Sequence, residues 1–243
     1  MNVIVSSGGT VEAIDTVRSI QNTSTGRLGS KIAEAFLEIP DAKVFYIAAK
    51  NAVKPEKNLS ENLKVINVVS VADVKNAFEE LCSKIKADVI VHSMAISDYR
   101  VKKASSFEDV KKAIKKDRDD FCDLRDLSEG GKLSSSIDDL VLFMERTPKI
   151  IGLLRNLAPE AIITGFKLLD SVSHENLIDT AFNLLKKNRC DFVLANDLSQ
   201  IDSFVHKGYL IDKNKDEKAF NTKEEIALGI RNAICAELKK RGK

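Results

Sequence analysis

Short apolar runs alternate with amphipathic segments along almost the whole chain, and this alternation limits the fold more than any other feature. The runs have the character of buried strands at Asn2–Ser6, Val44–Ala48, Leu63–Val69, Asp88–Ser93, Ala161–Gly165 and Asp191–Ala195. Apolar residues recur at helical spacing between and after them, at 26–37, 71–85, 147–155, 175–187 and 222–240. Near-continuous apolar strands separated by helices are typical of a parallel sheet covered on both faces. We therefore predict an α/β fold with a doubly wound, mostly parallel, Rossmann-like sheet that binds ligands at the carboxyl ends of its strands.

Local signals indicate where some of these elements begin or turn. Thr147, followed by a proline, has the pattern of an N-cap, and Thr222 is placed to cap the last helix. A late β-hairpin is expected about Lys207-Gly208, between the apolar runs 204–205 and 209–211.

Residues 99–142 break the alternation. This segment is mostly charged and has few large apolar side chains, so we do not expect it to form part of the core. Long loops in compact domains are usually functional lids or solvated excursions. Two interpretations stay open, a mobile charged flap over the site and a plain solvated insertion. Since there is no clear linker or internal repeat, we predict one domain over residues 1–243 that contains this insertion.

Charge and cysteine usage exclude several classes of function. The chain has 38 basic and 36 acidic residues, which removes the main electrostatic argument for a nucleic-acid or membrane partner. The basic cluster 111–118 is offset by neighbouring aspartates. No His or Cys spacing matches a zinc site, and the cysteines are expected to be reduced thiols: Cys82, Cys122, Cys190 and Cys235. With no signal peptide and no apolar run of ~18–20 residues, a cytoplasmic location is expected.

Two loops rich in small residues follow the first strand. Gly8, Gly9 and Thr10 come directly after it, and glycines there let a backbone approach a ligand closely. The second loop opens the first long helix, where free backbone N–H groups can hold an anion: Ser24, Thr25, Gly26 and Arg27. Together the loops predict phosphate binding.

The two loops are separated by Val11–Gln21, whereas a dinucleotide-binding fold passes directly from its glycine turn into the helix. This spacer carries Asp15 and Arg18. We expect it to move the anion-binding loop away from the strand end and to make room for a second substrate.

The string GGTVEAIDTVRSIQNTSTGRLG, residues 8–29, resembles the signature of the phosphopantothenate–cysteine ligase family. The resemblance continues downstream and leaves mainly 101–130 uncovered: Ala95–Tyr99, Gly131–Ser135, Thr147–Ile151, Gly165–Leu168 and Ala195–Asp197. It implies a homodimer with a shared site. Many bacterial members follow a flavin decarboxylase domain in one polypeptide. This chain resembles a stand-alone form, whose decarboxylase would be a separate protein.

The family's reaction is what the resemblance implies for this chain. A nucleoside triphosphate, with Mg²⁺ bridging its phosphates, activates the carboxylate of 4′-phosphopantothenate as an acyl-nucleotide. Pyrophosphate leaves, and the amine of L-cysteine then attacks the acyl carbon. Bacterial members generally use CTP and the eukaryotic branch uses ATP. Most details here resemble the bacterial pattern and favour CTP, although Phe166-Lys167-Leu168 is common in the eukaryotic branch.

The resemblance also implies roles for single residues of the acid side of the site. Asn22 matches a catalytic asparagine that contacts the acyl-nucleotide, and Arg18 matches an arginine that reaches the phosphopantothenate of the neighbouring subunit. Met94, Ala95 and Asp98 match a strand tip that contacts the pantothenate amide, although an alanine is expected at position 94. Structural alternatives stay open: a turn for Asn22, an ion pair with Asp15 for Arg18 and a cap for Asp98.

On the nucleotide side, the matching residues are spread over several loops. They are Gly8, Gly9, Thr10, Ser24, Thr25, Gly26, Arg27, Lys132, Gly165, Phe166, Lys167, Asn196 and Asp197. The family places a lysine seven residues ahead of the position of Asp191, where this chain has Leu184, so Lys186 or Lys187 is expected to substitute, with a plain helix-end role as the alternative. We take Lys187 as the catalytic candidate. No protein ligands for a metal are predicted.

Two other classes of function compete with the ligase. Tyr46 and Lys50 form the Y-x-x-x-K spacing of short-chain NAD(P)-dependent reductases, but an extended strand would hold them roughly 13 Å apart. A nucleotide-binding scaffold without turnover would keep the same fold. Release of pyrophosphate that requires both phosphopantothenate and cysteine distinguishes the ligase from the scaffold.

Overall fold

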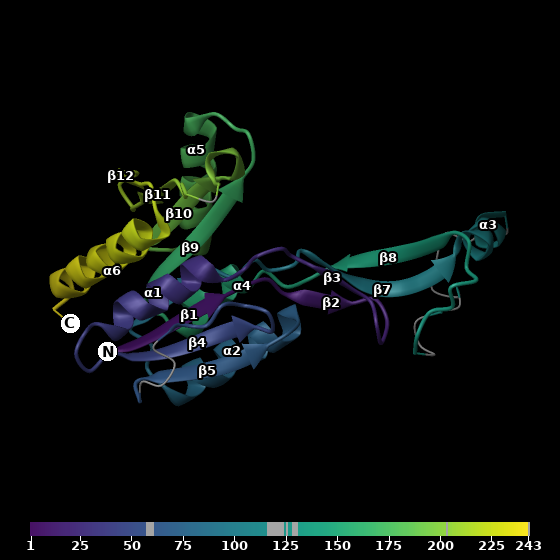
Figure 1. The fold of residues 1–243 in the computed structure, drawn as a ribbon, viewed down its shortest axis with the longest axis horizontal. Coiled ribbons are helices and arrows are strands. Elements are labelled where there is room, and N and C mark those ends of the chain that lie inside the picture. The colour runs from purple at the N-terminus through teal and green to yellow at the C-terminus, as the bar shows by residue number, and fades with distance from the viewer. Residues whose placement is uncertain (57–60, 116–123, 125, 128–130, 203, 243) are drawn as a thin grey trace.

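The computed structural model describes residues 1–56, 61–115, 124, 126–127, 131–202 and 204–242. The largest element among these residues is an eight-stranded sheet in the order β12-β11-β10-β9-β6-β1-β4-β5 (Figure 1). Its strands are β1 (Asn2–Ser7), β4 (Lys43–Ala49), β5 (Leu63–Val68), β6 (Val89–His92), β9 (Ile162–Leu169), β10 (Phe192–Asp197), β11 (Gly208–Ile211) and β12 (Glu217–Phe220). The first six run parallel to one another. Strand β11 is antiparallel to β10, and β12 is antiparallel to β11. The predicted α/β, mostly parallel sheet is confirmed.

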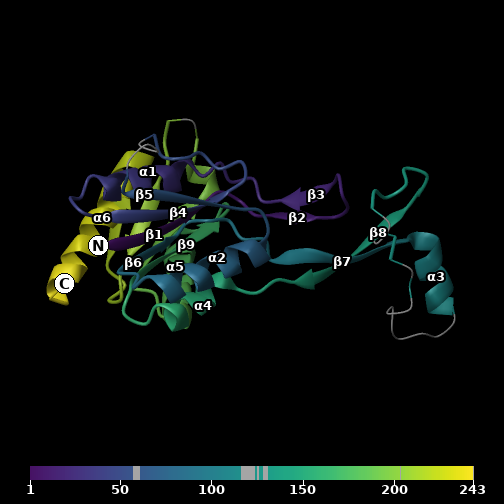
Figure 2. The same cartoon turned by 90° about the horizontal axis from the view of Figure 1, so that it is seen from below.

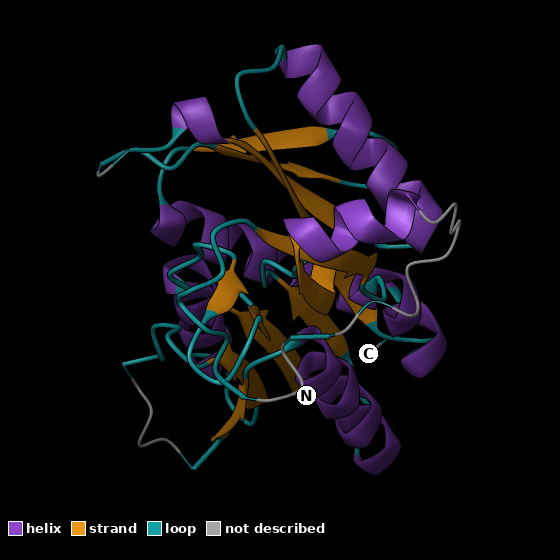
Figure 3. Cartoon of the chain, turned by 90° about the vertical axis from the view of Figure 1, so that its right-hand side faces the viewer, coloured by secondary structure: helices purple, strands orange, loops and turns teal. Residues whose placement is uncertain are grey.

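Helices cover both faces of the sheet (Figure 3). Helices α1 (Arg27–Leu37) and α6 (Lys223–Lys240) pack together on one face, and α2 (Val71–Lys84), α4 (Ile150–Leu157) and α5 (His174–Asn188) form a contiguous set on the other. The middle strands are therefore buried on both faces, as in β6, where every residue is buried. Since β1 lies between β4 and β6, the strand order reverses there, and this reversal opens a crevice at the carboxyl ends of β1 and β6.

Two ribbons extend from one end of the sheet (Figures 1 and 2). The shorter is the hairpin of β2 (Val11–Ala13) and β3 (Ser19–Gln21), which occupies the predicted spacer. The longer pairs β7 (Tyr99–Ser106) with β8 (Leu140–Arg146) and carries α3 (Phe107–Lys115) near its tip.

The expectation that 99–142 is a charged loop is therefore wrong for the ends of this segment. All of β7 and the first residues of β8, 140–142, fall inside it, and Ala104 and Leu133 are buried. The pairing of β7 with β8 satisfies the backbone groups without a large core, which composition alone did not reveal. Whether the ribbon moves over the site stays a prediction, and the acidic part of the cluster 111–118 and Cys122 lie outside the described residues.

Two local predictions need correction. Thr147 does not cap a helix, because α4 begins after Lys149 and the Thr147 hydroxyl donates to the carbonyl of Ser97 instead. The late hairpin forms, but its turn follows β11 rather than lying at Lys207-Gly208, since β11 pairs with β12. Thr222 caps α6 as predicted, accepting a hydrogen bond from the Glu225 N–H. Within the described residues, no helix is both long and apolar enough to cross a membrane.

Candidate active site

The loops that follow β1 and β6 are joined by backbone hydrogen bonds at the crevice. Ala95 N–H donates to the Gly8 carbonyl at 2.8 Å, and Thr10 N–H donates to the Ala95 carbonyl at 3.1 Å. The Thr10 hydroxyl accepts from Ser97 N–H at 2.8 Å. Residues predicted on separate strands are thus brought to one place, with Gly8, Gly9 and Thr10 beside Ala95.

Glycine at position 9 lets the spacer return to this loop. A Cβ atom on Gly9 would lie 2.1 Å from the carbonyl oxygen of Asn22, so only glycine fits there. The Asn22 N–H donates to the Thr10 carbonyl at 3.2 Å, and the Asn22 carbonyl accepts from Ser24 N–H at 2.9 Å. The backbone of Asn22 is therefore held on both sides while its side chain is left half-buried.

Helix α1 begins against the same strand ends. Gly26 has φ +74° at the N-cap, and its carbonyl accepts from the Ser7 hydroxyl at 2.9 Å. The first intrahelical bond runs from Ser30 N–H to Gly26, and no side chain caps this helix. Backbone N–H groups at positions 27–29 thus have no partner within the helix, as an anion site requires, and that of Arg27 makes only a long hydrogen bond of 3.5 Å to the Thr25 hydroxyl. The exposed Arg27 adds a positive charge.

A cleft of about 150 Å³ lies between the carboxyl ends of β6 and β9 and the start of α4. Most of its lining is apolar. The residues around it are His92, Met94, Ile96, Asp98, Lys149, Ile150, Ile151, Phe166 and Leu184. Three predicted site residues, Met94, Asp98 and Phe166, meet there.

Charge is confined to one part of this cleft. Asp98 and Lys149 form an ion pair, and Thr147 N–H donates to the Asp98 carbonyl at 3.0 Å. Asp98 therefore does not act as a simple turn cap. Because both side chains of the pair are well exposed, a substrate can compete for either partner at small cost.

His92 contributes a neutral polar group to the cleft. Its Nδ1 lies 2.6 Å from the Ser6 hydroxyl, and its ring meets Phe78 edge-on with centroids 5.6 Å apart. Burial lowers the pKa of His92 to about 4, so the imidazole is uncharged at neutral pH.

The β2–β3 hairpin is tied to the return segment of the longer ribbon. Asp15 accepts from the N–H groups of Val17, Arg18 and Leu133, and Arg18 Nη2 donates to the Leu133 carbonyl at 3.1 Å. The hydrogen bond from Val17 N–H is the largest influence that lowers the pKa of the Asp15 carboxyl. The ion pair of Arg18 with Asp15, one of the two interpretations, is present at 3.6 Å. Lys132 is exposed next to this contact.

The predicted nucleotide residues at the ends of β9 and β10 are mostly engaged within the protein. Gly165 lies where a Cβ would be 3.3 Å from Leu184, and Lys167 is half-buried on β9. Asn196 Nδ2 donates to the Lys207 carbonyl at 2.6 Å.

Asp197 organises the loop between β9 and α5. Its carboxylate accepts from Ser171 N–H at 2.9 Å, from Val172 N–H at 3.0 Å and from the Ser199 hydroxyl at 2.7 Å, at the start of the short helix η2 (Leu198–Gln200). The Ser199 hydroxyl is the largest influence, and the pKa of Asp197 falls to about 2.

Lys187 is not brought into this arrangement. It is exposed in the last turn of α5, whereas the cleft is lined one turn earlier by Leu184. The lysine that does line the cleft is Lys149, which the sequence analysis passed over although it lies within the Thr147–Ile151 motif. His92 was also missed, because a histidine at the end of an apolar strand has the pattern of a core residue.

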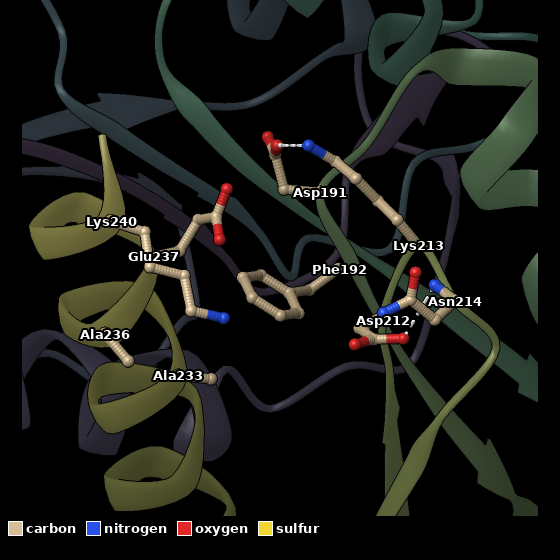
Figure 4. A pocket seen from close by; sticks show the side chains of 9 residues that line it. All are labelled: Asp191, Phe192, Asp212, Lys213, Asn214, Ala233, Ala236, Glu237 and Lys240. Atoms are coloured by element: carbon tan, nitrogen blue, oxygen red, sulfur yellow. Dashed lines mark hydrogen bonds and ion pairs between the residues drawn. The ribbon is translucent and has the colours of Figure 1, made fainter.

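A larger hollow of about 310 Å³ lies at the opposite ends of the strands, between the β11–β12 turn and the end of α6 (Figure 4). Asp191, at its edge, pairs with Arg155, Lys213 and Arg241. Burial alone would raise the pKa of Asp191, but the hydrogen bonds from Lys213, the Ile163 N–H and Arg241, in that order, lower it. Asp191 thus links the start of β10 to α4, the β11–β12 turn and the end of α6, and none of the predicted site residues lines this hollow.

The reductase alternative fails on the position of Tyr46. This residue is fully buried in β4, and its hydroxyl donates to the Val53 carbonyl at 2.7 Å. Burial raises its pKa to about 12, which makes it a poor proton donor.

Comparisons with known proteins agree with this geometry. The family model described as "DNA/pantothenate metabolism flavoprotein C-terminal domain" matches residues 1–238. The chain is 32% identical over 228 residues to the coenzyme A biosynthesis bifunctional protein CoaBC of Methanocaldococcus jannaschii, covering 93% of this chain and 48% of that protein. It is 31% identical over 100 residues to the phosphopantothenate–cysteine ligase of Mus musculus, covering 41% of this chain and 30% of the mouse protein.

A solved structure of a related protein has the same fold. The DNA/pantothenate metabolism flavoprotein of Streptococcus pneumoniae superposes with a TM-score of 0.85 at 37% identity, over 98% of this chain and 99% of that chain. By contrast, the chain spans about half the length of the bifunctional relative.

Proposed function

Because the chain belongs to the family of the DNA/pantothenate metabolism flavoprotein C-terminal domain, we propose that it joins 4′-phosphopantothenate to L-cysteine in coenzyme A biosynthesis. The observation that carries this proposal is the convergence of the 8–29 motif on the carboxyl ends of β1 and β6, where an anion site, Asn22 and an apolar cleft lie side by side. The names of the relatives support the same activity.

The reaction proceeds in two transfers. A carboxylate oxygen of phosphopantothenate attacks the α-phosphorus of the nucleoside triphosphate, the bond to the β-phosphate oxygen breaks, and pyrophosphate leaves. The cysteine amine then attacks the acyl carbon, loses a proton, and expels the nucleoside monophosphate. Each step needs reactants held in line and negative charge stabilised more than it needs a protein nucleophile.

The described residues suit a mechanism based on positioning and charge stabilisation. The N–H groups at the start of α1 that lack partners within the helix would hold triphosphate oxygens together with the Arg27 side chain. Asn22, fixed through its backbone, would direct its amide at the acyl-nucleotide without competing as a nucleophile. Met94, Ala95 and Asp98 would receive the pantothenate part, and Arg18 would reach the phosphate from the neighbouring subunit.

For the nucleotide we propose CTP rather than ATP, on the bacterial details of the motif. Mg²⁺ would supply charge neutralisation on the triphosphate. Among the described residues no three His, Cys, Asp or Glu side chains come together, so the proposal places the ion on phosphate oxygens rather than in a protein site.

We further propose a cytoplasmic homodimer. The ribbon supports a second copy as partner, because several of its large apolar side chains are exposed, among them Tyr99, Phe107, Ile114 and Met144. A second copy that packs along this projecting element would cover these exposed side chains.

The test combines CTP or ATP with phosphopantothenate, cysteine and Mg²⁺ and follows pyrophosphate and nucleoside monophosphate. We expect product only when all substrates are present, and faster turnover with CTP. Nucleotide binding without pyrophosphate release would favour the non-catalytic scaffold and contradict the ligase.

A further inference from the structure

The contact between Ser6 and His92 determines which ring nitrogen carries the proton. Ser6 is fully buried, and His92 Nδ1 is the one partner of its hydroxyl among the described residues. A buried hydroxyl hydrogen needs an acceptor, because leaving it unpaired costs about 1–3 kcal/mol. If Nδ1 carried the ring proton, the Ser6 hydrogen would have no acceptor. We therefore assign the proton to Nε2.

The ring is held in this orientation by its surroundings. Phe78, itself fully buried, contacts it at an interplanar angle of 76°. His92 is only 6% exposed and lines the cleft, and in the described part of the chain no group bonds its Nε2. One N–H donor, on a largely buried residue that lines the cleft, is thus left for whatever fills the cleft.

The chemistry around this donor limits the acceptor. The neighbouring lining residues are Met94, Ile150, Ile151, Phe166 and Leu184, and the two charged ones, Asp98 and Lys149, pair with each other. An uncharged donor among apolar side chains does not repay the desolvation of a phosphate dianion. It suits an uncharged carbonyl oxygen on a flat group that can lie against Phe166.

We propose that His92 is a specificity-determining residue whose Nε2–H donates to an uncharged carbonyl oxygen of a substrate in this cleft. The inference rests on the proposed ligase function. The amide of phosphopantothenate and a carbonyl-bearing pyrimidine base both provide such an oxygen, and binding measurements on each separate them.

The experiment measures the dissociation constants of CTP and of phosphopantothenate, each alone, by calorimetry. His92→Phe keeps the ring shape and removes the donor, His92→Gln places an N–H near the position of Nε2, and His92→Asn is too short to do so. His174→Gln is the matched control, since His174 lies on the surface and pairs with Glu217.

We expect His92→Phe and His92→Asn to weaken one of the two ligands about three- to tenfold, as loss of a single neutral hydrogen bond predicts. The other ligand and the control should be unaffected, and His92→Gln should recover most of the loss. The affected ligand identifies the source of the carbonyl. If His92→Phe does not fold, the comparison of the Gln and Asn variants decides.

Wild-type affinity for both ligands in the Phe and Asn variants would overturn the inference. Equal weakening of the binding of both ligands would also overturn it, as would a Gln variant that binds as weakly as the Asn variant. The ligation assay on the wild-type protein separates failure of the His92 proposal from failure of the proposed ligase function. An active wild type with unaffected variants removes only the role of His92, whereas an inactive wild type removes the proposed function and this inference together.

Discussion

Gly9 and Asn22 are in direct contact at the centre of the site, and this contact makes the first prediction. We expect Gly9→Ala to destabilise the fold by about 1–3 kcal/mol and to reduce ligation at least tenfold, because the new Cβ would overlap the Asn22 carbonyl. Urea denaturation and the ligation assay measure the two effects. Gly152→Ala is the control: its Cβ would lie 3.5 Å from Asn188, an ordinary contact, within α4. A fully active Gly9→Ala enzyme would show that the position of Asn22 is unimportant.

Asn22→Asp tests the side chain rather than its placement. The backbone bonds of residue 22 do not change, so the fold should persist, while a negative charge replaces an amide donor beside the acyl-nucleotide. We expect ligation to fall by about two orders of magnitude. Gln21→Glu adds the same charge at an exposed neighbouring position and should retain activity. An unchanged rate in Asn22→Asp would remove Asn22 from the mechanism.

At this scale the sequence predicts backbone-determined positions better than side-chain environments. Gly26 was expected at the start of the first long helix, and the structure places it at the N-cap of α1 with φ +74°, while Gly8 has φ +92° in the loop after β1. The environment of His92 could not be predicted, because it depends on Ser6 and Phe78, which tertiary contacts bring from two other elements. Lys187 illustrates the converse error, since a residue chosen by spacing along a helix lies away from the cleft.

At the scale of elements, Asp197 holds β10, η2 and the loop before α5 together, and this gives a pH dependence. Its pKa is about 2 in the folded state, below the ordinary value of 3.8. Its contribution to stability is therefore present above pH ~4 and lost as the pH falls toward 2. We expect Asp197→Asn to lower the urea midpoint at pH 7, with a difference from wild type that shrinks between pH 4 and 2. Asp170→Asn, at an exposed position in the same loop, controls for the lost charge. A difference independent of pH would contradict this account.

Elements with a strong apolar period were predictable, whereas those whose stability comes from pairing were not. Most strands of the sheet and the helices that cover it lie close to their predicted ranges because they bury apolar faces. Strands β7 and β8 were missed because their partners are forty or so residues apart in a charged segment, and no local period records that pairing. The turn after β11 was misplaced for a similar reason, since Lys207-Gly208 has the local pattern of a turn while β12 supplies the pairing.

For the whole molecule, the projecting ribbon predicts an effect on assembly. Met144→Glu places a charge among its exposed apolar side chains and should convert the proposed dimer into a monomer with little loss of stability. Light scattering after gel filtration measures the mass, and the ligation assay shows whether the site needs both copies. Leu228→Glu, at a similarly exposed position on α6, is the control. A dimer that persists in Met144→Glu would place the interface elsewhere.

The tether between the β2–β3 hairpin and Leu133 has a consequence for how tightly an anion can be held. Arg18 donates to the Leu133 carbonyl and pairs with Asp15. A phosphate that binds the Arg18 guanidinium must therefore first displace this hydrogen bond and this ion pair. By linkage, loosening of the contact between the hairpin and Leu133 would then be coupled to tighter substrate binding. A substitution that weakens this contact would therefore raise the affinity for the phosphate-bearing substrate. It would also make the ligand-free protein more susceptible to proteolysis near residue 133.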